Sequence, residues 1–178
     1  MGLSRRLEEI EQDAGHVSMP CNFVLVRRIV ATEREYMAFV SSTRLRVRSW
    51  RYLFGFTVHS LRSSLQARRV DGCYAVLLLR EDRNTFWTCT VWRDDKAMRT
   101  FMTAGAHMRA MPKLLEWCDE ASVVHWLQEN IEAPSWDEIH RRMQVDGRRS
   151  KVNHPSEAHL AYQLPPPRVK RTSQLRFK

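Results

Sequence analysis

The stretch that decides the fold is Thr85–Trp126, TFWTCTVWRDDKAMRTFMTAGAHMRAMPKLLEWCDEASVVHW. Its first eight residues form a strand pattern, in which successive side chains point to opposite faces of a sheet. Neither of the two faces is fully polar. We therefore predict that residues 85–92 are a central strand covered on both sides, and that residues 121–126 return as a second, short strand.

Between these two strands the sequence predicts a broken helix. Asp94 and Asp95 suit a helix N-terminus, where acidic side chains interact favourably with the helix dipole. An apolar pattern at helical spacing follows, and Gly105 and then Pro112 interrupt it. We expect a helix over residues 94–104, a kink, and a second helical segment that runs to about residue 118.

Three further elements are predicted upstream. Residues 37–47 alternate as a strand, and Ser49 can cap a helix that runs to about Ala67. Residues 73–80 form a mostly apolar strand, joined to residues 85–92 by a short polar loop. The buried stripe of the helix is expected to consist of side chains at helical spacing: Trp50, Phe54, Thr57, Val58, Leu61 and Leu65.

Charged residues follow two patterns. Arg44 and Arg46 lie on one side of the first strand, and that side must reach solvent, a sheet edge or an acidic partner, because an unpaired buried guanidinium is very costly. Residues 148–178 hold eight of the 29 Lys and Arg residues, one of the 20 acidic residues and three consecutive prolines. Such a segment can bury little apolar surface, so we predict a mobile basic tail. Removal of residues 150–178 is then expected to leave the melting temperature nearly unchanged.

The order of elements from residue 37 is β-α-β-β-α-β, which is the order of the ferredoxin-like α+β fold. Ser135 and Glu138 open an extra C-terminal helix with a capping-box pattern. The face of the sheet opposite the two main helices carries Trp87 or Trp92, and an exposed apolar patch of that kind usually marks an interface. We therefore predict a homodimer that packs two sheets face to face. Three parts are expected. Residues 1–35 are an N-terminal extension that contains a further strand, residues 36–147 are the ferredoxin-like domain, and residues 148–178 are the tail.

Composition limits the class of protein. The chain has 43% hydrophobic residues, six Trp and seven Phe, which favours a packed core. No apolar run approaches the ~20 residues of a membrane span, and the N-terminus lacks a signal-peptide core, so a cytoplasmic protein is expected. The cysteines (Cys21, Cys73, Cys89 and Cys118) lack metal-site spacing and are predicted to be reduced thiols, and no metal site is expected. The strands lack an RNA-binding consensus, so nucleic-acid binding is not expected.

Within Thr85–Trp126, a set of positions carries a resemblance to a known family: Trp92, Asp94, Gly105, His107, Ala110, Met111, Trp117 and Glu120. The pattern resembles the antibiotic-biosynthesis-monooxygenase type of dimeric α+β barrel, and in particular the spheroidene-monooxygenase-like group and related small uncharacterised proteins. The resemblance implies a ferredoxin-like dimer and an oxygenase that uses either haem or no cofactor. Haem-degrading members of the wider superfamily place a ligand histidine about one turn after His107, at the position of Met111.

His107 is the candidate catalytic and cofactor-binding residue, because an imidazole can ligate haem iron or act as a base near neutral pH. Its structural alternative is a histidine hydrogen-bonded at the kink, where Gly105 frees backbone groups. Met111 is the candidate second cofactor ligand, with core packing as its alternative. The candidate substrate-pocket residues, some of which core or dimer packing would also explain, are Trp87, Trp92, Leu114, Trp117 and His125.

Two functions follow from these candidates. The first is a monooxygenase-like enzyme that acts on a small apolar organic substrate in a cavity lined by His107. The second is a non-catalytic ligand-binding or interaction protein on the same dimeric scaffold. A purified protein with the absorbance of bound haem would favour the first.

Overall fold

The computed structural model describes residues 37–170, except residue 83, and residues 173–177. The predicted N-terminal extension over residues 1–35, with its strand and Cys21, lies outside this range. Among the residues described, no helix is both long enough and apolar enough to cross a membrane.

The described strands form one antiparallel sheet in the order β5-β4-β1-β3-β2-β6. Their bounds are β1 (Ala38–Val47), β2 (Cys73–Arg80), β3 (Thr85–Trp92), β4 (Cys118–Gln128), β5 (Arg148–Arg149) and β6 (Gln174–Phe177). β3 lies between β1 and β2, which confirms the predicted central strand. The register pairs Thr43 with Thr88 and Ser41 with Thr90 on neighbouring strands.

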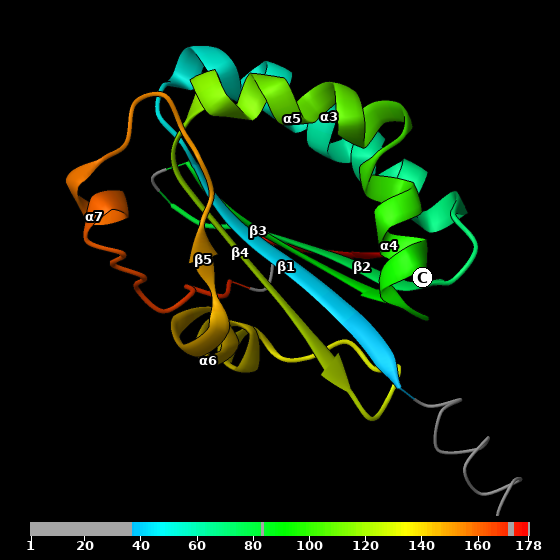
Figure 1. Ribbon diagram of the computed structural model, residues 1–178. Coiled ribbons are helices and arrows are strands. Elements are labelled where there is room, and N and C mark those ends of the chain that lie inside the picture. The colour runs from blue at the N-terminus through cyan, green and yellow to red at the C-terminus, as the bar shows by residue number, and fades with distance from the viewer. Residues whose placement is uncertain (1–36, 83, 171–172, 178) are drawn as a thin grey trace, which may run out of the picture. The chain divides into compact units, whose positions relative to one another are not determined.

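Helices cover both faces of this sheet (Figure 1). α3 (Trp50–Arg69), α4 (Asp95–Met102) and α5 (Gly105–Trp117) lie over one face, and α6 (Trp136–Asp146) lies over the other. A short helix, α7 (Glu157–Leu160), follows in the C-terminal segment. The fold is therefore the predicted ferredoxin-like α+β arrangement with an extra C-terminal helix. Ser135 caps α6 as expected, because its hydroxyl accepts the backbone N–H of Glu138 at 3.2 Å.

The predicted break between the two helical segments is confirmed. α4 ends at Met102 and α5 begins at Gly105, which has a φ of +56° that an L side chain rarely adopts. The second expected interruption does not end the helix, since Pro112 lies inside α5. A proline removes one hydrogen bond of the helix ladder, and packing of the apolar face of α5 maintains the remaining turns.

The sheet face that was predicted to be bare is covered within the chain. Trp136, Ile139 and Met143 of α6 pack with Trp87 and its neighbours in one buried cluster. The chain after β4 returns across this face as α6, whereas the prediction considered only the two main helices. The sheet face is therefore not available as a homodimer interface.

The register of α3 also differs from the prediction. Trp50 is 76% exposed and Phe54 is 82% exposed, whereas Phe56, Ser64 and Ala67 are buried. The helix therefore turns a face made largely of small residues toward the sheet. A stripe of large apolar residues is left on its outer side.

The C-terminal segment differs from the predicted mobile tail, because it packs along the described sheet. β6 pairs with β2, and the hydroxyl of Tyr162 donates to the carbonyl of Met143 at 2.8 Å. The backbone N–H of Ser150 donates to Ala121 in β4 at 2.8 Å. Backbone hydrogen bonds of this kind can order a segment of low hydrophobicity, and local composition does not reveal them.

Candidate functional site

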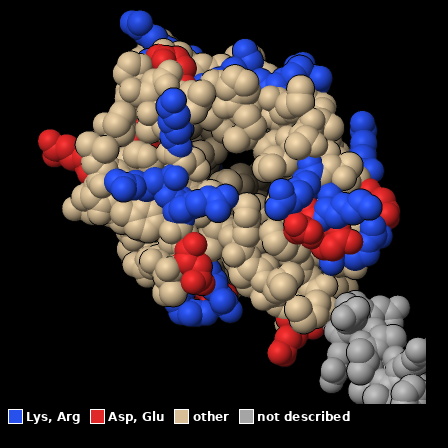
Figure 2. All heavy atoms as spheres, in the orientation of Figure 1, with Lys and Arg blue, Asp and Glu red and all other residues tan. Residues whose placement is uncertain are grey.

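A cavity of about 380 Å³ lies between the sheet and the layer of α3, α4 and α5. Figure 2 shows a hollow in the surface in this orientation, bordered by Lys and Arg side chains. The volume falls at the lower end of the ~300–1,000 Å³ range of small-molecule sites. Lining side chains come from β1, β2, β3, β4, β5 and all three helices.

The sheet side of the cavity carries hydroxyl groups. The hydroxyls of Thr43 and Thr88 form a hydrogen bond with 2.7 Å between their oxygens. The hydroxyl of Thr90 donates to the carbonyl of Ser41 at 3.2 Å. These residues share one face because β1 and β3 are paired in register. The alternation of Thr with apolar residues in β3 was visible in the sequence, and it marks this polar row.

The α3 side of the cavity is lined largely by small residues and holds one unsatisfied polar atom. The hydroxyl of Ser64 donates to the carbonyl of Ser60 at 2.9 Å, four residues earlier in the helix. Ser63 also lines the cavity, and its buried hydroxyl oxygen has no hydrogen-bond partner. A buried hydroxyl without a partner costs free energy, so a ligand with a polar group at this place would recover a hydrogen bond.

His107 lies at the start of α5, where Gln66 of α3 holds the break between α4 and α5. The Gln66 side-chain oxygen accepts the backbone N–H groups of Ala106 and His107, at 2.5 and 3.0 Å. Its amide nitrogen donates to the carbonyls of Phe101 and Ala104 at 3.1 and 3.0 Å. One side chain thus satisfies backbone groups that two helix ends leave open.

The tautomer of His107 follows from its partner. Nδ1 lies 3.1 Å from the carbonyl oxygen of Met102, and because a carbonyl only accepts, Nδ1 carries the proton. Nε2 then carries the lone pair of the neutral ring, and the ring lines the cavity. Burial lowers the pKa of His107 below its ordinary value, and the hydrogen bond to Met102 opposes that shift.

Two further histidines line the cavity. Burial, followed by the nearby charges of Arg148 and Arg99, lowers the pKa of His125. Burial, followed by the charge of Lys113 and further arginines, lowers the pKa of His59. His125 was a predicted pocket residue and lies in the cavity, whereas His59 was not predicted.

The structure brings only part of the predicted pocket together. His107, Met111, Leu114 and His125 line the cavity. Trp87 lies on the opposite face of the sheet near α6, where its indole nitrogen donates to Glu81 at 2.6 Å. Trp92 is fully buried and stacks on Phe101.

Trp117 is likewise outside the lining, because it packs between helices. Its ring stacks on Tyr52 of α3 with 6.1 Å between centroids, and a Cβ on Gly55 would lie 3.2 Å from it. Gly55 therefore permits the close approach of α3 and α5. Large aromatic side chains fill the core in these places, and the cavity lies where smaller residues leave space.

The basic residues at the β5 edge were not predicted to belong to the site. Arg148, Arg149, Ser150 and Lys151 line the cavity, and β5 reaches it by pairing with β4. Arg149 donates to the carbonyl of Leu160. No local signal placed these residues here, because their position depends on the return of the chain after α6.

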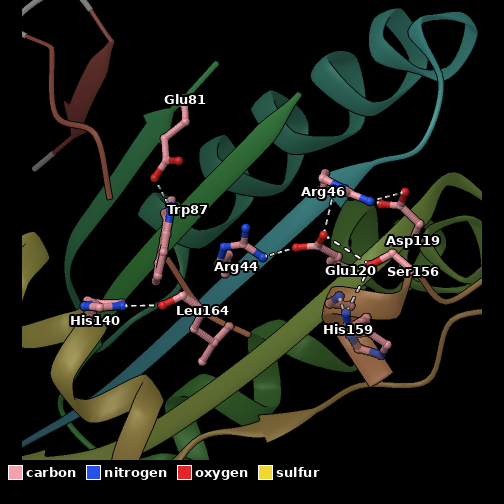
Figure 3. Close-up of polar contacts among 11 residues, drawn as sticks. Arg44, Arg46, Glu81, Trp87, Asp119, Glu120, His140, Ser156, His159 and Leu164 are labelled. Carbon is pink, nitrogen blue, oxygen red and sulfur yellow. Dashed lines mark hydrogen bonds and ion pairs between the residues drawn. The ribbon is translucent and has the colours of Figure 1, made fainter. Parts of the chain in front are cut away.

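A buried charged cluster lies outside the cavity lining, at the start of β4 (Figure 3). Glu120 pairs with Arg44 and also with Arg46, whose Nη1 is 2.8 Å away, and both Arg44 and Glu120 are less than 5% exposed. Arg46 makes two further hydrogen bonds to Asp119, at 2.8 and 2.7 Å. The acidic partner expected for these arginines is therefore present. Ser156 adds a hydrogen bond to Glu120 at 3.2 Å.

Other reactive groups are unsuited to nucleophilic chemistry. Burial raises the pKa of the Cys73 thiol to about 11 and that of Cys89 to about 12. Burial likewise raises the pKa of Cys118 to about 12. These three are free thiols. No group of three or more potential metal ligands occurs among the residues that the structure describes.

Haem does not fit the cavity well. A porphyrin is a broad apolar disc, whereas this cavity is small and β1 and β3 contribute four Ser and Thr residues to its lining. His107 and Met111 are one turn apart on the same helix and cannot approach an iron from opposite sides. The tautomer of His107 suits a metal ligand, but the surrounding residues do not suit the macrocycle.

Comparison with known proteins gives a family but no activity. A family described as "Domain of unknown function (DUF3291)" matches residues 55–157. No curated protein gave a significant match.

Solved structures with a similar fold include a protein of unknown function from Nitrosomonas europaea, with 11% identity and a TM-score of 0.48 over 57% of this chain and 98% of that chain. A putative antibiotic biosynthesis monooxygenase from the same organism has 14% identity and a TM-score of 0.44, over 49% of this chain and 95% of that one. SnoaB, a cofactor-independent oxygenase from Streptomyces nogalater, has 18% identity and a TM-score of 0.41, over 54% of this chain and 95% of that one.

Proposed function

Since the chain belongs to the DUF3291 family, whose description names no activity, we propose from the cavity itself that the protein is a monooxygenase-like enzyme that needs no cofactor. In this proposal a small organic substrate occupies the cavity and His107 is its general base. The observation that carries the proposal is the tautomer of His107, whose bond to Met102 leaves the lone pair on Nε2. A base near neutral pH needs an unprotonated nitrogen beside the substrate.

The reaction proposed is the oxidation of an ionisable aromatic substrate such as a phenol by dioxygen. His107 accepts the phenol proton, and the resulting electron-rich anion reacts with dioxygen. The substrate loses its phenol hydrogen and one ring hydrogen and gains one oxygen atom as a carbonyl. The second oxygen atom leaves as water with those two hydrogens, so that dioxygen is the oxidant and no external reductant is needed.

Oxygen uptake with a panel of naphthols tests this function, because a naphthol combines an ionisable hydroxyl with an apolar body. Uptake that depends on the substrate, that gives a quinone, and that His107→Gln reduces by more than about tenfold would support the proposal. His154→Gln is the matched control, because His154 is an exposed histidine outside the cavity lining. Equal rates for the two variants would contradict a base role of His107.

A non-catalytic ligand-binding protein is the second candidate function. The observation that favours it is the structural use of His107, whose ring and backbone both serve the break between α4 and α5. In that case His107→Gln would lower stability, naphthols would bind without oxygen uptake, and no quinone would form.

A homodimer, which the resemblance of the sequence implies, is part of the proposal. Because α6 covers the sheet, we place the interface between two copies on the outer face of α3, where Trp50, Phe54, Leu61 and Leu65 are exposed. Light scattering should give twice the monomer mass of 21.1 kDa, and Trp50→Ser with Phe54→Ser should give the monomer mass. A monomer mass for the unmodified chain would contradict this assembly.

A further inference from the structure

The charges that line the cavity are of one sign. Arg148, Arg149 and Lys151 line it at the β5 edge, and no Asp or Glu occurs among the described lining residues. Lys and Arg side chains also border the hollow in Figure 2. With Arg149 bound to the carbonyl of Leu160, Arg148 and Lys151 are the cations left to meet a ligand. A cavity with excess positive charge favours anionic ligands.

The lining side chains differ from strand to strand across the sheet. In the strand order β5-β4-β1-β3-β2, the basic residues come first, and β4 follows with His125 and the apolar side chains of Ala121 and Val123. The hydroxyl rows of β1 and β3 occupy the middle, represented by Thr43 and Thr88. The last strand, β2, contributes the apolar side chains of Val76 and Leu78. A ligand that lies across the strands therefore meets cations, then hydroxyls, then hydrocarbon.

We propose that the ligand of this cavity is an elongated organic anion, with its single anionic group at Arg148 and Lys151 and its apolar end over β2. This inference rests on the proposed function only in taking the cavity as the substrate site, and it does not depend on the role of His107. The hydroxyls of Thr43 and Thr88 lie on the middle strands and suit a carbonyl or hydroxyl group of the ligand, and the unsatisfied hydroxyl of Ser63 lines the same cavity.

A pair of matched fluorescent probes tests the anionic end. Anilinonaphthalene sulfonate and phenylnaphthylamine share the same aromatic body, and only the first carries a charge. The anionic probe should bind at least about tenfold more tightly, which corresponds to about 1.4 kcal/mol. Its affinity should fall in 1 M salt, where the screening length drops to ~3 Å, while that of the neutral probe should not.

Substitutions at the two ends of the cavity test where the anionic group and the apolar end of the ligand bind. Arg148→Gln with Lys151→Gln should weaken the anionic probe by about tenfold and leave the neutral probe unchanged. Arg51→Gln with Lys96→Gln removes the same charge from exposed residues outside the cavity and is the matched control. Leu78→Thr, at the β2 end, should weaken both probes to a similar extent.

Decanoate should displace the anionic probe, whereas decanol, with the same chain length and no charge, should displace it poorly. Equal affinity for the two probes would overturn the proposal, and so would an equal effect of the Arg148/Lys151 and Arg51/Lys96 variants. These binding experiments do not depend on oxygen uptake. A failure of the proposed enzyme activity and a failure of anion selectivity are therefore separate results.

Discussion

The side-chain oxygen of Gln66 accepts the backbone N–H of His107 at 3.0 Å, and this bond ties α3 to the first turn of α5. Through the same side chain, α3 also holds the end of α4. The candidate base is therefore positioned by Gln66, a residue of α3 that lies forty-one residues earlier in the chain. A Cβ on Gly105 would lie 2.7 Å from the Gln66 oxygen, so the glycine is required for this contact.

Gln66→Ala is expected to lower the free energy of unfolding by about 1–3 kcal/mol, because it leaves backbone groups at two helix ends without partners. Urea denaturation measures the change. Gln144→Ala, at an exposed position of α6, is the control and should change stability by less than about 0.5 kcal/mol. Equal values for the two variants would show that water replaces Gln66 without cost.

Stability should fall as the pH drops below about 6.5, the ordinary pKa of histidine. His107 and His125 have lowered pKa values in the folded state because of burial, so the unfolded chain binds more protons in acid. Their contribution is fully present above the unfolded pKa and is lost as the pH falls toward the folded one. His107→Gln should flatten the dependence between pH 7 and pH 5, measured by denaturation against the unmodified chain.

Leu164→Ala is expected to destabilise the protein by about 1–2 kcal/mol, because Leu164 packs against the core cluster under α6. Leu160→Ala, at a residue 59% exposed, is the matched control and should be nearly neutral. Melting temperatures of the two variants compare them directly. If neither variant changes the melting temperature, the C-terminal segment does not dock as described.

Glu120→Gln should cost about 3–5 kcal/mol, because it leaves Arg44 buried without its anionic partner. Glu116→Gln removes a carboxylate from a pair with Arg48 that water screens, and should destabilise the protein much less. Replacing both members of the buried pair, with Arg44→Met and Glu120→Leu, should be less harmful than Glu120→Gln alone. A double variant as unstable as the single one would contradict this account of the cluster.

The order of the elements could be predicted from the sequence, because strand alternation and the Gly105 break are local patterns. The register of α3 could not, because its inner face borders a cavity. Ser60, Ser63 and Ala67 line that cavity, while Trp50 and Phe54 remain outside. The usual assumption that the largest apolar stripe of a helix is buried fails where the inner face of the helix lines a cavity.

The candidate site was predictable in part. His107, Met111 and Leu114 share one face of α5, and helical spacing alone places them together. The predicted role of Trp87 was based on residue size, whereas this ring fills the core on the far side of the sheet. The basic residues of β5 reach the cavity through long-range strand pairing, which no local pattern encodes.

The central claim, that His107 meets a ligand through Nε2, is tested most directly by NMR of the histidine ring nitrogens during titration with a naphthol. The free protein should show His107 as the neutral tautomer with the proton on Nδ1. Saturating naphthol should shift the Nε2 resonance of His107 and leave that of His154 unchanged. A His107 ring protonated on Nε2, or one whose resonances do not respond to a ligand that binds, would contradict the account.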